Sequence, residues 1–252
     1  MRKLIKENPV PAFIVIAFGW TWPLAALIEQ SLIFPVLGLF GPCVAAIIVI
    51  WASRGRSGLA QLGNKFRLTR ALLPWCLVAA LLPLVLLVPI WLLHAAWWTP
   101  SRVAVEPLSF LGLTLAVLIV GEEIGWRGFL LPYFLERYSP LISSLIVGIV
   151  WAVWHLPNFL LPNFPHHGLP FTAFVIMTLG FSVLFTWFFM NTAGSLVIAV
   201  IFHAALNLFS LSGLEPARVY WLKAAVYSLA ALAATWVIGR SRSWPNTSKS
   251  AA

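Results

Sequence analysis

Long apolar runs separated by short polar connections make up most of this chain. A helix needs about 20 mainly apolar residues to cross the hydrocarbon core of a bilayer. The pattern therefore predicts an all-α polytopic membrane protein. It indicates eight transmembrane helices, at Pro11–Ile28, Leu32–Ala52, Ala71–Leu93, Leu108–Leu135, Leu141–Leu161, Phe171–Met190, Ser195–Leu211 and Val219–Ile238.

Two of the predicted spans contain residues that interrupt a helix. The fourth run is too long for one straight crossing, and Gly128 and Pro132 are expected to kink it or end it early. In the fifth run, Pro157 cannot donate a backbone hydrogen bond to the carbonyl of Val153. We therefore expect this helix to bend just after His155.

The connections between spans are short, and the longest, Ser53–Arg70, is basic. There is no internal repeat or long linker, so the chain is expected to form one membrane domain. Within it we distinguish three N-terminal spans (residues 1–107), a central part (108–211), and a last span with a basic tail (212–252).

Composition and charge placement support this picture. Charged residues make up only 9% of the chain, against about 25% in soluble domains. A net charge of +9 is also compatible with nucleic-acid binding, but twelve of the sixteen lysines and arginines fall on the side of the two termini. This asymmetry predicts that both termini are cytoplasmic. It also indicates that the basic residues face the lipid bilayer and do not bind nucleic acid. Cys43 and Cys76 lie inside apolar runs and indicate no disulfide framework.

The fourth span carries two adjacent carboxylates and an arginine, which are costly in hydrocarbon and usually face a protein interior. Glu123 and Arg127 are four residues apart, share a helical face and are expected to pair. Glu122 is turned from Glu123 by about 100°. It is therefore predicted to be the free, reactive carboxylate.

Two other spans bring further polar side chains. His155 lies in the fifth span, and His203 and Asn207 lie one turn apart in the seventh. Each can be explained singly by packing, because a lone membrane histidine often makes an interhelical hydrogen bond. Together with Glu122, they favour one shared site between the fourth, fifth and seventh helices.

Such a set can hydrolyse a peptide bond. Glu122 and a neutral His155 can polarise a water molecule, while His203 and Asn207 can donate hydrogen bonds to the oxyanion of a tetrahedral intermediate. Two histidines and a carboxylate, namely Glu122, His155 and His203, equally match a catalytic zinc site. The residues alone leave both alternatives open.

Three motifs in this order resemble the CPBP family of intramembrane proteases, which includes CAAX prenyl proteases and bacteriocin-immunity (Abi) proteins. They are Glu122-Glu123-x-x-x-Arg127, Trp151-x-x-x-His155 and His203-x-x-x-Asn207. The resemblance spans about residues 108–211. It implies that Glu122 and His155 activate water and that His203 and Asn207 hold the oxyanion. Glu123 and Arg127 would shape the site, as would Trp151, which stands where the family usually has phenylalanine.

The resemblance therefore implies an intramembrane endopeptidase acting on membrane-associated peptides or proteins. We favour a metal-free mechanism without a cofactor over a divalent metal such as zinc, and a bacterial cell membrane as the location. A catalytically silent scaffold or immunity protein of the same fold is the alternative. A proton-coupled transporter is favoured less, because no pair of broken helices indicates inverted repeats.

Overall fold

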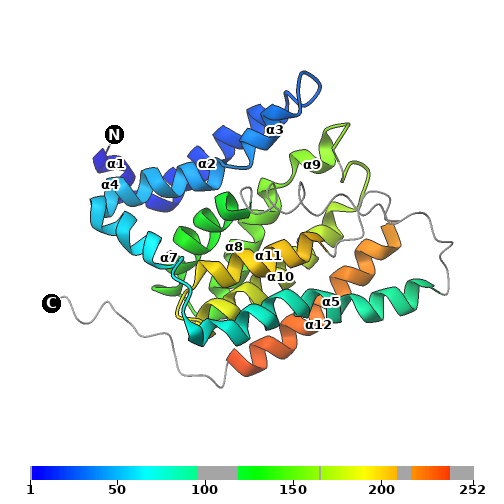
Figure 1. The fold of residues 1–252 in the computed structure, drawn as a ribbon. Helices are drawn as coiled ribbons and strands as arrows, with labels where there is room; N and C mark the ends of the chain where they lie inside the picture. The colour runs from blue at the N-terminus through cyan, green and yellow to red at the C-terminus, as the bar shows by residue number, and fades with distance from the viewer. Residues whose placement is uncertain (1, 96–118, 165, 209–216, 239–252) are drawn as a thin grey trace.

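A computed structural model of the chain describes residues 2–95, 119–164, 166–208 and 217–238 (Figure 1). All regular structure in these ranges is helical. Among the described residues, three segments are long and apolar enough to cross a membrane, Ile33–Asn64, Arg70–Ile90 and Phe171–Asn191. Together these support an integral membrane protein, whereas the count of eight spans and the side of the termini stay predictions.

The N-terminal helices form one layer at the edge of the molecule. They are α1 (Arg2–Glu7), α2 (Pro9–Ala25), α3 (Ile33–Gly38) and α4 (Gly41–Asn64). Helix α2 packs against both α3 and α4. A Cβ atom on Gly41 would lie 2.2 Å from the Thr21 hydroxyl oxygen, so this glycine allows α2 and α4 to approach closely.

The prediction of a polar connection at Ser53–Arg70 is wrong, because most of this segment is helical and α4 continues to Asn64. Gly55 breaks the helical geometry with φ 62° and ψ −150°, and the helix resumes beyond it. Only a glycine adopts this backbone conformation readily. The resumed turns bury Gly58 and Leu62 and leave Arg56 and Ser57 exposed. The many basic residues of Ser53–Arg70 obscure this amphipathic pattern in the sequence.

The fourth predicted span is irregular where the kink was expected. Residues 119–125 are α-helical, a π-helical turn η2 follows at Trp126–Leu130, and α7 covers Leu131–Leu135. Gly128 lies in the π-helical turn, and Pro132 lies in the first turn of α7. The predicted start of this span, at Leu108, lies outside the described residues.

The predicted bend after His155 is confirmed. Helix α8 (Pro140–Trp154) begins with a Ser139 cap, whose hydroxyl accepts a hydrogen bond from the Ile142 N–H, and it ends at Trp154. The short helix α9 (Pro157–Leu160) begins at the proline, whose missing N–H costs nothing in a first turn.

Three helices occupy the middle of the molecule in Figure 1, between the layer of α2–α4 and the pair of α5 (Leu73–Ala95) and α12 (Ala217–Ile238). They are α8, α10 (Phe171–Asn191) and α11 (Leu196–Leu208). Helix α10 packs against α8 and α12, and α11 packs against α5, which follows a 3₁₀ turn η1 (Arg70–Leu72). The Ser182 hydroxyl donates to the Ser144 carbonyl at 2.7 Å and joins α10 to α8. The boundaries predicted at residues 107 and 211 lie outside the described residues.

Candidate functional site

Glu123 forms the centre of a buried ion-pair network. Its Oε1 accepts from Arg127 Nη1 at 2.8 Å and from His203 Nδ1 at 2.7 Å. Glu123 and Arg127 are fully buried, and His203 is 5% exposed. The predicted pairing of Glu123 with Arg127 is confirmed. The bond to His203, which the sequence did not indicate, joins the 119–125 helix to α11.

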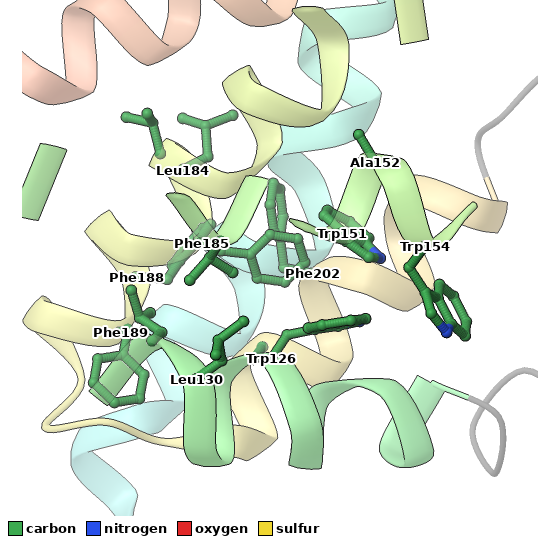
Figure 2. Close-up of a cluster of buried hydrophobic side chains, with 14 of the residues drawn as sticks. Trp126, Leu130, Trp151, Ala152, Trp154, Leu184, Phe185, Phe188, Phe189 and Phe202 are labelled. Carbon is green, nitrogen blue, oxygen red and sulfur yellow. The ribbon is translucent and has the colours of Figure 1, made fainter. Parts of the chain in front are cut away.

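Aromatic rings hold the other side of Arg127. Its guanidinium carbon lies 3.5 Å from the ring centroid of Phe185 and 4.6 Å from that of Trp151. Figure 2 shows Phe185, Trp151 and Trp126 among the side chains of the buried aromatic cluster. A cation over ring faces is stabilised by the ring quadrupole, more strongly when it is desolvated. Arg127 is therefore fixed by one carboxylate and two rings from separate helices.

Glu122 has different partners. Its Oε2 accepts from the Trp151 indole N–H at 3.0 Å and from the Trp126 indole N–H at 3.4 Å, and the residue is 6% exposed. The helical geometry predicted that the two acids would face apart, and they do. The expectation of an unpaired Glu122 is wrong, because two indoles donate to it. The Trp151 contact could not be foreseen, since this residue reaches Glu122 from another helix, whereas Trp126 lies four residues away in the same segment.

His155 caps the C-terminus of α8. Its Nδ1 lies 2.9 Å from the carbonyl oxygen of Trp151. A carbonyl can only accept a hydrogen bond, so we assign the proton to Nδ1, which leaves Nε2 with a free lone pair. The bend before Pro157 places the ring edge-on to Trp154, with ring centroids 4.7 Å apart.

A cavity of about 110 Å³ lies where these helices meet, and it is large enough for several water molecules. Among the sequence-predicted residues, Trp151 and His155 from α8 and His203 and Asn207 from α11 line it. The other three predicted residues, Glu122, Glu123 and Arg127, do not appear in its lining. Glu122 lies one hydrogen bond behind the wall, through the Trp151 indole.

The cavity is also lined by residues that the sequence did not place at the site. His166, Tyr220, Lys223 and Tyr227 line it. His166 Nδ1 is hydrogen-bonded to the Tyr220 hydroxyl, and burial together with the nearby Lys223 lowers the pKa of His166 to about 4. From the sequence, His166 and His167 are expected to be solvated loop histidines, with metal binding as the weaker alternative, because only the tertiary structure brings this loop against α12.

The observed positions of Glu122, His155 and His203 do not fit a zinc site. Within the described residues, no three side chains among His, Cys, Asp and Glu come together in a group that could hold a metal ion. Glu122 is engaged by two indoles, and His203 has one ring nitrogen on Glu123. Glu122, His155 and His203 would have to rearrange to bind one ion.

Two comparisons with known proteins find similarity to CAAX prenyl proteases. Residues 104–209 match the family described as type II CAAX prenyl endopeptidase Rce1-like. The chain is also 31% identical over 108 residues to CAAX prenyl protease 2 of Methanococcus maripaludis. That alignment covers 40% of this chain and 39% of the relative. Residues 104–209 are therefore similar to the CAAX prenyl proteases, the family that the three motifs resemble.

Proposed function

We propose that this protein is an intramembrane endopeptidase that hydrolyses peptide bonds of membrane-associated peptides or proteins. The observation that carries the proposal is the cavity bordered by His155, His203 and the Asn207 amide, with the Glu123 network directly behind His203. The similarity to CAAX prenyl proteases supports the reaction class.

In the proposed reaction, His155 and Glu122 activate the attacking water. The Nδ1–H of His155 is held by a carbonyl, so Nε2 can accept a hydrogen bond from water in the cavity. Glu122 takes the water proton once the Trp151 indole turns aside, because that indole now lies between the carboxylate and the cavity. The hydroxide attacks the peptide carbonyl, and the proton passes to the leaving amine.

His203 and Asn207 stabilise the charge that develops on the carbonyl oxygen. Glu123 accepts the Nδ1–H of His203, so Nε2 is the ring nitrogen that remains for the substrate, and it donates when the ring carries both protons. The Asn207 amide, one turn further along α11, supplies a second donor. Donors fixed before the reaction lower its barrier because they need not reorganise. Glu123 and Arg127 act as positioning residues, and no step passes through a metal ion.

The test is cleavage of a membrane-anchored reporter peptide in proteoliposomes. Glu122→Gln, His155→Ala and His203→Ala should each abolish cleavage while the protein still folds and inserts. Glu123→Gln should instead lower the thermal stability, because it leaves Arg127 without its carboxylate, a loss that costs about 3–5 kcal/mol for buried pairs. Full cleavage by Glu122→Gln would overturn the assignment of this acid.

The same variants separate the alternatives. If Glu122→Gln keeps a complete immunity or scaffold activity, the fold serves as a binding protein. If proton-coupled flux in liposomes is lost in this variant, the site belongs to a transporter. Metal analysis of the purified, active protein tests the zinc alternative directly.

A further inference from the structure

A second, smaller cavity lies away from the proposed catalytic site, between the resumed half of α4 and the π-helical turn. Its volume is about 60 Å³, too small for a peptide segment but enough for a small polar group. Its polar lining consists of Arg54, Gln61, Lys65 and Tyr133, and its remaining walls are Ile50, Gly58, Leu62, Gly128, Phe129 and Pro132.

Glycines keep this space open. A Cβ atom on Gly128 would lie 2.8 Å from the Leu62 side chain, and one on Gly58 would lie 2.6 Å from Arg54 Cβ. The break at Gly55 re-aims α4 so that the residues on both sides of it, Arg54 and Lys65, border the same cavity. A side chain at either small position would therefore displace the cavity wall.

The two cations are close enough to repel each other. Burial and the nearby Arg54 lower the pKa of Lys65 to about 8, and Glu136 offsets only part of this effect. The ammonium of Lys65 also lies 4.9 Å from the ring centroid of Phe189. A bound anion between the two cations would relieve the repulsion.

One carboxylate competes for this position. Glu136 Oε1 lies 3.5 Å from Arg54 Nη2, and its Oε2 lies 3.2 Å from Arg137 Nη1. The Glu136 side chain is 36% exposed, and exposed ion pairs of this kind contribute about 1 kcal/mol or less. An anion with more charge than a carboxylate can therefore displace it from Arg54.

We propose that this cavity binds a phosphate group, with Arg54 and Lys65 as its cationic ligands and Gln61 and Tyr133 as hydrogen-bond donors. Arginine and lysine are the usual phosphate ligands of proteins. The cavity lies on the side of the basic residues, where the charge asymmetry predicts the cytoplasmic leaflet with its anionic lipids. A phospholipid headgroup and free phosphate share this chemistry. The proposal does not depend on the endopeptidase function.

The test measures the thermal unfolding of the purified protein in a neutral detergent against added phosphatidylglycerol, phosphatidylcholine or inorganic phosphate. We expect a saturable rise in Tm with phosphatidylglycerol that is larger than with phosphatidylcholine. Arg54→Gln and Lys65→Gln should each weaken the apparent affinity by about tenfold or more, as expected for the loss of one charge-assisted contact. A matching rise with inorganic phosphate would identify free phosphate as the ligand.

Two further variants keep the proposal falsifiable. Arg56→Gln removes an exposed charge that does not line the cavity, and it should bind like the intact protein. Glu136→Gln removes the competing carboxylate and should tighten binding, which a merely structural role of Arg54 would not produce. Equal losses in Arg56→Gln and Arg54→Gln, or no saturable rise with either ligand, would overturn the proposal. Arg54 is exposed, so its variant is expected to fold even if Lys65→Gln does not.

Discussion

Trp151 connects the buried Glu122 and Arg127 to the cavity of the proposed site. Its indole N–H donates to Glu122, its ring packs against the Arg127 guanidinium, and the residue lines the same cavity as His155 and His203. A phenylalanine at this position would keep the ring contacts but lose the N–H donor. The departure from the family pattern therefore affects Glu122 more than it affects the shape of the bundle.

Trp151→Phe is expected to raise turnover of a reporter peptide by about tenfold or more, because no indole N–H then has to leave Glu122 before the carboxylate takes the water proton. It should also lower the Tm, because Glu122 loses the shorter of its two indole donors, and hydrogen bonds to charged groups contribute about 1.5–3 kcal/mol. The measurement is kcat and KM in proteoliposomes.

Trp20→Phe is the matched control, because the Trp20 indole donates to the Leu37 carbonyl at the exposed surface, at 3.0 Å. Turnover of Trp151→Phe equal to that of this control would show that the Glu122 hydrogen bond has no part in the reaction.

His166 is expected to make the stability depend on pH. Its pKa is about 4 in the folded protein and about 6.5 in an unfolded chain, so between these values the unfolded state binds more protons. Stability should therefore fall as the pH drops from about 6.5 to 4.

His166→Gln should flatten this part of the Tm–pH curve in detergent, because its side chain takes up no proton. His167→Gln, at the exposed neighbouring position, should leave the curve as it is in the intact protein. Parallel curves for the intact protein and His166→Gln would contradict the assignment.

At the scale of the helices, the irregular segment from residue 119 to Leu135 is largely buried by the neighbouring helices. The α-helical turns place Glu122 and Glu123 on different faces, and the π-helical turn carries Arg127. Such turns are frequent at functional sites. Close packing of this segment depends on its glycines, since a Cβ atom on Gly125 would lie 2.4 Å from Pro42 Cβ.

Gly125→Ala should therefore destabilise the protein by about 1–3 kcal/mol or more, because the 119–125 helix must move away from the first turn of α4. Thermal unfolding in detergent measures this loss. Gly19→Ala in α2 is the control, with no atom within 4 Å of the added Cβ, and it should be neutral or slightly stabilising. A Tm for Gly125→Ala at or above that of the control would refute the packing claim.

At the scale of the whole molecule, the described helices place the break at Gly55 in α4, the smaller cavity proposed to bind phosphate, and Glu136 in one region. The charge asymmetry predicts that this region faces the cytoplasm. The catalytic proposal requires a substrate that reaches a cavity between α8, α10, α11 and α12. Both statements depend on the orientation of the chain in the bilayer.

Fusions of a cytoplasm-active and a periplasm-active reporter to each terminus, expressed in bacteria, test that orientation. We expect both termini to be cytoplasmic, because twelve of the sixteen basic residues lie on their side. Termini on opposite sides would require an odd number of spans, and the count of eight would then be wrong.

The sequence by itself indicated a membrane protein, a segment that resembles CAAX prenyl proteases, and one ion pair. Long apolar runs report membrane helices because hydrocarbon leaves few other structures possible. A four-residue spacing within one helix likewise predicts Glu123 with Arg127, because local geometry alone decides which faces coincide. Pro157 predicted the end of α8 for a similar, local reason.

Only the tertiary structure decided which groups meet across helices. It brought His203 to Glu123, placed the Trp151 indole on Glu122, and set His166 against Tyr220. It also showed that Gly55 turns α4 back into a helix that borders a second cavity. These contacts join residues far apart in the chain, so they depend on how helices pack and rotate. Periodicity in the sequence reports which face of a helix is polar, but not which neighbour that face will meet.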